Sequence, residues 1–193
     1  MKPIHKPPKK KHKLPSNITV SIAFLEPVEE ELQELLALIV KDYCRRFKAK
    51  ITKNKVHISI AGIENSRAGP GTPIGMTIAN YDNAGKEVNR ILVQIRDPYL
   101  DDDVSSKHIY ILFCFLQVIC HEFVHVAQHL TGRLNGKTNN SDFIKYTKKR
   151  RDERYFFDPD EIEARLLETF YAYRYAFDLL VISEDILPEA LLE

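Results

Sequence analysis

The segment from His121 to His125 contains two imidazoles and a carboxylate at a spacing that suits metal chemistry. Residues four apart on an α-helix lie on the same face, so His121 and His125 can both reach one ion. Glu122 lies about 100° around the helix axis from His121, where its side chain can reach a water on that ion and act as a general base. Zinc lowers the pKa of such a water from about 15.7 to about 7. The motif therefore predicts a zinc-dependent hydrolase.

The residues before this motif favour a metal over ordinary hydrogen bonds. Residues 109–120 are apolar on nearly all sides, which is typical of a helix buried in a globular core. Two histidines and a glutamate at the end of such a helix are costly to bury unless something pairs with them, and a bound ion would pair with all three. The alternative, helix-surface histidines with ordinary hydrogen bonds, stays open because a short motif also occurs by chance.

A catalytic zinc ion needs a third protein ligand. A histidine six residues after the second is absent, because Thr131 stands at that position. His129 lies two helical turns, or about 12 Å of rise, from His121, and one ion cannot bridge that distance. We therefore expect His129 to be a partly exposed residue at the helix end.

A second helix is predicted to begin near residue 158. Asp158 or Asp160 can serve as its N-cap, and Pro159 suits its first turn. A glutamate in the first turn of this helix is well placed to point at a metal held by the first helix.

At these two helices the chain resembles the gluzincin metallopeptidases, in which HExxH on one helix is completed by a glutamate on a later helix in a short E-x-x-A-[D/N] signature. The run Glu161-Ile162-Glu163-Ala164 matches the first four positions, and Arg165 departs from the fifth. The resemblance implies that Glu161 is the third zinc ligand beside the two histidines, that Glu122 activates water, and that the reaction is hydrolysis of a peptide bond.

Three details of this site stay open in the sequence. Glu163 lies about 200° around the helix from Glu161, so only one of them can face the ion, and we expect Glu163 to be a solvated or outer carboxylate. Ligand histidines normally donate their other N–H to a carboxylate or carbonyl, and the departure at Arg165 leaves that partner undecided. Gln128 either lines the site or caps the helix end. The candidate partners of the ligand histidines are Asp158, Asp160, Glu168 and a backbone carbonyl.

The remaining chain predicts an α+β fold. Strands are expected at 18–25 and 56–60, with His57 on a polar face, a helix at 28–47, a loop at 68–77, and a hairpin of 78–81 with 90–95. This order resembles the minimal zincin architecture, a small mixed sheet packed on an N-terminal helix and a buried HExxH helix, with a C-terminal helix that carries the glutamate. By that resemblance, 90–95 or 74–79 is an edge strand that pairs with an extended peptide.

Composition predicts one soluble domain. The chain has 193 residues, of which 44% are hydrophobic and 28% charged, as is ordinary for a globular protein. No apolar run reaches the roughly 18 residues of a membrane span, and the start lacks the apolar segment of a secretory signal. The three cysteines, at positions 44, 114 and 120, form no paired framework and suit a reducing compartment, so a cytoplasmic location is expected.

The first 15 residues differ in composition from the rest. They contain six lysines and no acidic side chain, which predicts a disordered basic arm at 1–15 in front of a single domain at 16–193. Such an arm could make a weak contact with nucleic acid or another polyanion, or it could be a solubilising tail without a partner. A second basic run lies at 145–154.

Three other functions compete with a zinc peptidase that acts on a peptide or protein substrate. A zinc amidase of the deformylase type would, by resemblance, need a cysteine ligand in a Gly-Cys-Leu context, which Cys44 and Cys114 lack. A nucleic-acid-associated protein with a structural metal would use the basic arm. A partner-binding protein without catalysis would not need Glu122.

Overall fold

The computed structural model describes residues 12–23, 29–63, 75–82, 84–96, 108–134 and 157–182. Their elements follow in the order β1 (Ile18–Ala23), α1 (Glu29–Phe47), β2 (Val56–Ile63), β3 (Gly75–Tyr81), β4 (Val88–Arg96), α2 (His108–Leu130) and α5 (Pro159–Ile182). The predicted α+β class is confirmed. Residues 1–11 of the basic arm and the basic run at 145–154 lie outside the described residues, so the division into arm and domain stays a prediction. None of the described helices has the length and apolar character to cross a bilayer.

The four strands form one mixed sheet in the order β1-β2-β4-β3. β1 and β4 run parallel to β2, and β3 runs antiparallel to β4. The parallel pair β1 and β2 needs a crossover connection, and α1 lies in that connection. β3 and β4 form the predicted hairpin, in which the Asp82 carboxylate accepts hydrogen bonds from the backbone N–H groups of Lys86 at 2.8 Å and Glu87 at 3.3 Å. Gly85 in this turn has a φ of 66°, a conformation that favours glycine.

The position of β3 corrects two predictions. Residues 90–95 lie in β4, which has β2 on one side and β3 on the other, so their assignment to an edge is wrong. Of the alternative segment 74–79, residues 75–79 lie in β3, which is at the edge of the sheet. The loop expected at 68–77 is wrong for its last three residues, because pairing with β4 outweighs the glycine and proline content of the preceding segment.

The two faces of the sheet differ in polarity. Side chains that alternate along β2 and β4 are buried on the helix side, and these are Val56, Ile58, Ile60, Ile91, Val93 and Ile95. The opposite face is polar near β1, where the His57 ring lies 3.0 Å from the Thr19 hydroxyl and 3.1 Å from the Ser21 hydroxyl. The prediction that His57 lies on a polar face is confirmed.

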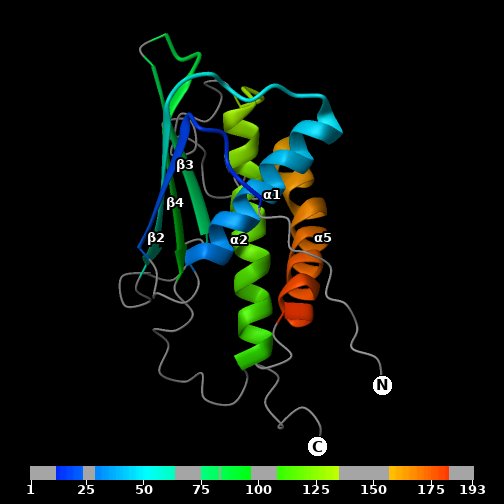
Figure 1. Cartoon of the computed structure of the whole chain (residues 1–193). Helices are drawn as coiled ribbons and strands as arrows, with labels where there is room; N and C mark the ends of the chain where they lie inside the picture. Colours follow the sequence, from blue (N-terminus) through cyan, green and yellow to red (C-terminus); the bar gives the residue numbers. More distant parts are fainter. Residues whose placement is uncertain are drawn as a thin grey trace, which may run out of the picture.

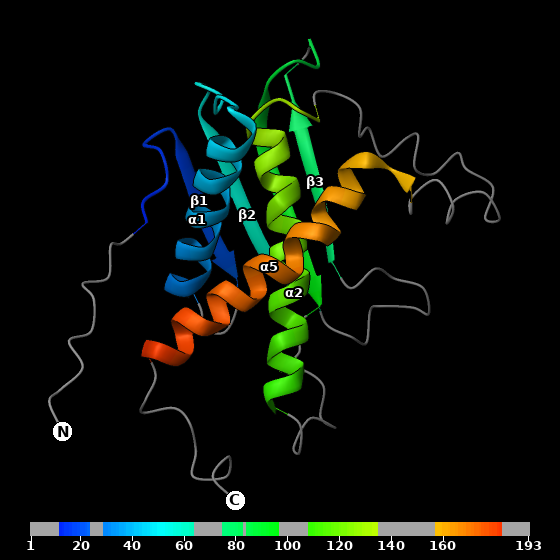
Figure 2. The same cartoon turned by 90° about the vertical axis from the view of Figure 1, so that its right-hand side faces the viewer.

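The helices stack on one side of this sheet. Figure 1 shows the sheet, then α1 and α2, then α5, and Figure 2 shows α5 crossing α2 on its side away from the sheet. α2 contacts α1, α5, β3 and β4. A helix with neighbours on so many sides must be apolar all round. Of the run at 109–120, the structure describes the side chains from 116 on, and there the predicted burial is confirmed by Leu116, Ile119 and Cys120.

Each flanking helix buries one apolar stripe. The stripe of α1 is buried throughout, at Leu32, Leu35, Leu36, Ile39, Val40 and Tyr43. On α5, Leu167, Tyr171 and Tyr175 are buried. Phe170 lies on the solvent side of the same helix and is 54% exposed.

The start of α5 follows the predicted capping pattern. The Asp158 carboxylate accepts a hydrogen bond of 2.8 Å from the backbone N–H of Asp160, and the Asp158 carbonyl accepts one of 2.9 Å from Ile162. Pro159 is the first helical residue, where its missing N–H costs nothing. This cap places Glu161 in the first turn of α5.

His129 is buried, so the expectation that it is partly exposed at the helix end is wrong. Its side chain is 2% exposed, and its Nδ1 lies 2.6 Å from the hydroxyl of Tyr81 on β3. The Tyr81 hydroxyl donates to the carbonyl of Leu134 at 3.0 Å, so it accepts the proton of His129 Nδ1. Burial, with a smaller contribution from the nearby His125, lowers the pKa of His129 to about 3. His129 is therefore a neutral core residue, because β3 covers the end of α2.

The low pKa of His129 predicts a loss of stability in mild acid. The unfolded state gains a proton as the pH falls through about 6.5, whereas the folded state resists protonation down to a pH of about 3. The free energy of unfolding should therefore fall below pH 6.5, with a slope that approaches about 1.4 kcal/mol per pH unit. Urea denaturation between pH 7 and 5 measures this slope, which His129→Gln should reduce. An equal slope in both proteins would contradict the assignment.

Candidate metal centre

Two helices bring together the residues that the motif and the resemblance predicted. His121 and His125 extend from α2, and Glu161 extends from the first turn of α5. The two Nε2 atoms are 3.2 Å apart, and the Glu161 carboxylate oxygens lie 3.3 Å from His121 Nε2 and 3.4 Å from His125 Nε2. One ligand atom from each residue lies within 4.8 Å of the others. The three side chains converge on one point.

The outer nitrogen of each ring has its own partner. His121 Nδ1 donates to a carboxylate oxygen of Glu168 at 2.7 Å, and His125 Nδ1 donates to the amide oxygen of Gln128 at 2.7 Å. Each Nδ1 therefore carries a proton, so Nε2 is the atom of each neutral ring that can offer a lone pair to a metal. Glu168, which was among the candidate partners, lies two turns after Glu161 on α5. Gln128 lines the site.

The arrangement fits a metal ion. Three electron-rich groups face one another in a partly buried position, with the two imidazoles 12% and 11% exposed and Glu161 17% exposed. Among the described residues, the buried Oε2 of Glu161 has no hydrogen-bond partner. Two ligand atoms about 2.0–2.1 Å from one tetrahedral ion are about 3.3 Å apart, which is close to the 3.2 Å between the two Nε2 atoms and to the distance from each of them to its nearer Glu161 oxygen. The group of His121, His125 and Glu161 could hold a metal ion, and its donor set suits zinc or iron(II).

The charges of this group depend on one another. Burial alone would lower the pKa of His121, but the carboxylates of Glu161 and Glu168 outweigh it and raise that pKa to about 9. The pKa of His125 is also raised against the effect of burial, by Glu161 and Glu122. Burial alone would raise the pKa of Glu161, but the two imidazoles lower it well below its usual range. In the absence of a cation, protons on the imidazoles balance the carboxylates, so a metal competes with protons here.

Glu122 lies between α2 and the edge strand β3. Its side chain is 5% exposed, and the Thr77 hydroxyl donates to its Oε2 at 2.6 Å. A Cβ added to Gly75 would lie 2.7 Å from its Oε1, so only glycine leaves room for the carboxylate. Burial raises the pKa of Glu122, although His125 and the Thr77 hydroxyl act in the opposite direction. A buried carboxylate with a raised pKa beside a group that could hold a metal is suited to proton transfer.

Glu163 points away from the converging group. Its Oε2 accepts hydrogen bonds from Arg133, from the Tyr43 hydroxyl at 3.2 Å and from the Gln128 amide at 2.9 Å. The group that could hold a metal contains Glu161 and not Glu163, in keeping with the expected outer position of Glu163. Arg133 also contacts the carboxylate of Asp160 at 3.0 Å.

Sequence reasoning missed Gly75, Thr77 and Arg133 as neighbours of this centre. Gly75 and Thr77 fell in a segment that was expected to be a loop, and the alternation of Thr77 with Met76 and Ile78 was the available signal of a strand. Arg133 follows α2 in a turn that no motif marks. Its two ion-pair partners, Asp160 and Glu163, both lie on α5, so these contacts could not be predicted without the position of that helix.

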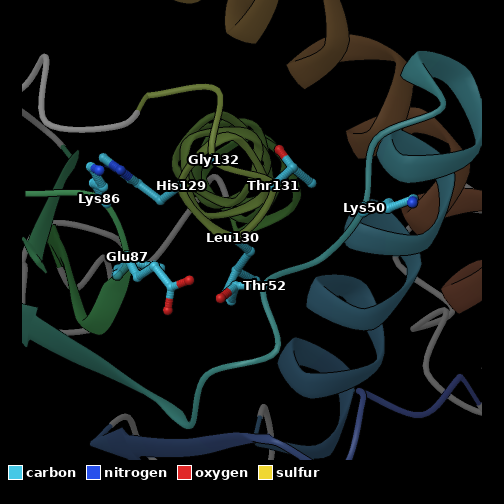
Figure 3. A pocket seen from close by; sticks show the side chains of 9 residues that line it. Lys50, Thr52, Lys86, Glu87, His129, Leu130, Thr131 and Gly132 are labelled. Atoms are coloured by element: carbon cyan, nitrogen blue, oxygen red, sulfur yellow. The ribbon is translucent and has the colours of Figure 1, made fainter. Parts of the chain in front are cut away.

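A cavity of about 180 Å³ lies beside the C-terminal end of α2, separate from the candidate ligands. Figure 3 shows His129 and Lys86 on one side of this end, and Thr131 and Lys50 on the other. The cavity lining includes none of the three residues that could hold a metal.

No family model, curated protein or solved structure matches this chain. The interpretation of the site therefore depends on its own geometry and chemistry.

We predict that the protein binds one zinc ion and releases protons as it does so. Because the pKa of His121 is about 9 without metal, binding at pH 7.5 must displace a proton, and the apparent affinity should rise with pH until about pH 9. Calorimetric titration in two buffers of different ionisation enthalpy measures the protons released. Glu161→Gln should weaken zinc binding by more than the roughly 10–100-fold that is typical when a hydrogen-bond partner of a ligand residue is mutated.

The matched control is Glu87→Gln, the same change at an exposed position between β3 and β4. Glu87 lines the separate cavity and is not part of the converging group. This variant should bind zinc as the native protein does. Equal affinity of Glu161→Gln and the native protein would remove Glu161 from the site.

Proposed function

We propose that this protein is a zinc-dependent metallopeptidase in which His121, His125 and Glu161 hold zinc and Glu122 is the general base. The observation that carries the proposal is the convergence of two imidazole Nε2 atoms and one carboxylate at separations of 3.2–3.4 Å, with Glu122 next to the first histidine. Two histidines, one carboxylate and an open fourth position form a typical catalytic zinc site. Zinc supplies a Lewis acid that makes water acidic enough to lose a proton near neutral pH.

The protein groups around Glu122 support its role as base. The Thr77 hydroxyl occupies Oε2 at 2.6 Å, which leaves Oε1 to accept a proton from water. Since burial raises the pKa of Glu122, the carboxylate holds that proton more readily than an exposed glutamate would. It can then deliver the proton to the departing amine of a cleaved amide.

A peptide or protein substrate is proposed from the position of β3. This strand is at the edge of the sheet, and it carries Gly75 and Thr77, which contact Glu122. An extended peptide added to this edge would pass the base. A deformylase-type amidase is less well supported, since the converging group contains no cysteine. A nucleic-acid contact through the basic arm stays a prediction, as does the cytoplasmic location.

Glu122→Gln tests the proposed base. The amide is nearly isosteric but cannot accept the proton, so hydrolysis should fall by about 10²–10⁴-fold. The readout is cleavage of a diverse peptide library, followed by mass spectrometry, with zinc content measured on the same samples. Zinc should be retained in both proteins. Equal cleavage by both proteins, or absence of zinc from the native protein at neutral pH, would refute the proposal.

Thr77→Val tests the hydrogen bond that orients the base. A bond to a charged group contributes about 1.5–3 kcal/mol, so kcat should fall about 10–100-fold with little change in KM. The Thr77 hydroxyl lowers the pKa of Glu122, so its removal should raise that pKa and move the acidic limb of the kcat profile to higher pH. Thr77→Ser should restore both properties. A native profile in the valine variant would show that the bond has no role in catalysis.

A further inference from the structure

We propose that Gln128 is a positioning residue that fixes the proton of His125 on Nδ1 and also sets the first turn of α5, with Glu161, against α2. This inference rests on the proposed metal site but concerns a residue outside the ligand set. Gln128 has no exposed surface, and each end of its amide contacts a different helix. It therefore links the two elements that supply the candidate ligands.

The neighbours of Gln128 determine which way its amide lies. The Nε2 end is 3.2 Å from the carbonyl oxygen of Asp160 and 2.9 Å from a carboxylate oxygen of Glu163. Both of these oxygens can only accept hydrogen bonds, so the NH2 group must face them. The carbonyl end must then face His125 Nδ1 at 2.7 Å.

This orientation decides the tautomer of His125. An amide oxygen only accepts, so His125 Nδ1 must carry a proton, and in the neutral ring Nε2 then offers its lone pair toward Glu161 and His121. The reversed amide would leave Nδ1 facing a donor and would favour a proton on Nε2. That proton would occupy the position a metal ion needs.

Glu163 and Arg133 hold the amide in place. Arg133 contacts the carboxylates of both Asp160 and Glu163, and the Tyr43 hydroxyl also donates to Glu163. The backbone N–H of Arg133 also donates to the backbone carbonyl of Gln128 at 2.9 Å. The turn after α2 is thereby tied to the residues on either side of Glu161.

A glutamate could not replace this glutamine. His121 has the carboxylate of Glu168 as its outer partner, and Glu168 needs only to accept. Gln128 must accept from His125 and donate to Asp160 and Glu163 at the same time, which only an amide can do. The two histidines therefore have chemically different partners, and His121 is an internal control for changes at Gln128.

The test compares native protein with Gln128→Met and Gln128→Glu, each loaded with zinc. Methionine has a similar length but cannot accept from Nδ1, whereas glutamate accepts but cannot donate. The readouts are the affinity for zinc, by competition with a chromogenic chelator, and the ring ¹⁵N and Nδ1–H resonances of His121 and His125. In Gln128→Met, the His125 Nδ1–H signal should be lost or exchange rapidly with solvent while the His121 signal stays, and zinc affinity should fall about 10–100-fold.

In Gln128→Glu, the His125 Nδ1–H signal should persist, but affinity should still fall, because Asp160 and Glu163 lose their donor. This variant keeps the proposal testable if the methionine variant does not fold. Native affinity together with a native His125 signal in Gln128→Met, or native affinity in Gln128→Glu, would overturn the inference. If the native protein itself binds no zinc, the proposed function fails instead, so the two failures are distinguishable.

Discussion

The structure depends on the close approach of two imidazoles and one carboxylate from different helices. His121 and His125 direct their Nε2 atoms at each other and at Glu161, at separations of 3.2–3.4 Å. Lone pairs at such distances repel unless a cation or protons lie among them. The raised pKa of His121 and the lowered pKa of Glu161 are the response of these groups to one another. A metal ion would replace the protons and satisfy all three groups at once.

The layers of the fold hold this group in place. α2 is packed between the sheet and α5, so its histidines have little freedom to move apart (Figures 1 and 2). The Asp158 cap fixes where α5 begins, and Gln128 and Arg133 connect that beginning to the end of α2. From the opposite side, Thr77 on β3 fixes the Glu122 carboxylate. Glu122 and the group that could hold a metal share α2, but the contacts that hold them come from different sides, from β3 for Glu122 and from α5 for the histidines.

The sequence predicted those parts of the site that depend on position along one helix. The i, i+4 relation of His121 and His125 and the opposite directions of Glu161 and Glu163 follow from helix geometry alone. Partners set by packing between elements could not be predicted in this way. Glu168 could be chosen from four candidates only once the crossing of α2 and α5 was known. Thr77 required the order of the sheet, and His129 is buried because Tyr81 on β3 covers it, which no local pattern indicates.

The most direct test of the metal centre is the position of zinc in crystals of the protein, located by anomalous scattering at the zinc absorption edge. We predict a single strong peak about 2.0–2.2 Å from His121 Nε2, His125 Nε2 and a Glu161 carboxylate oxygen. A peak at other residues, or full zinc occupancy with Glu161 turned away from the ion, would contradict the proposed ligand set.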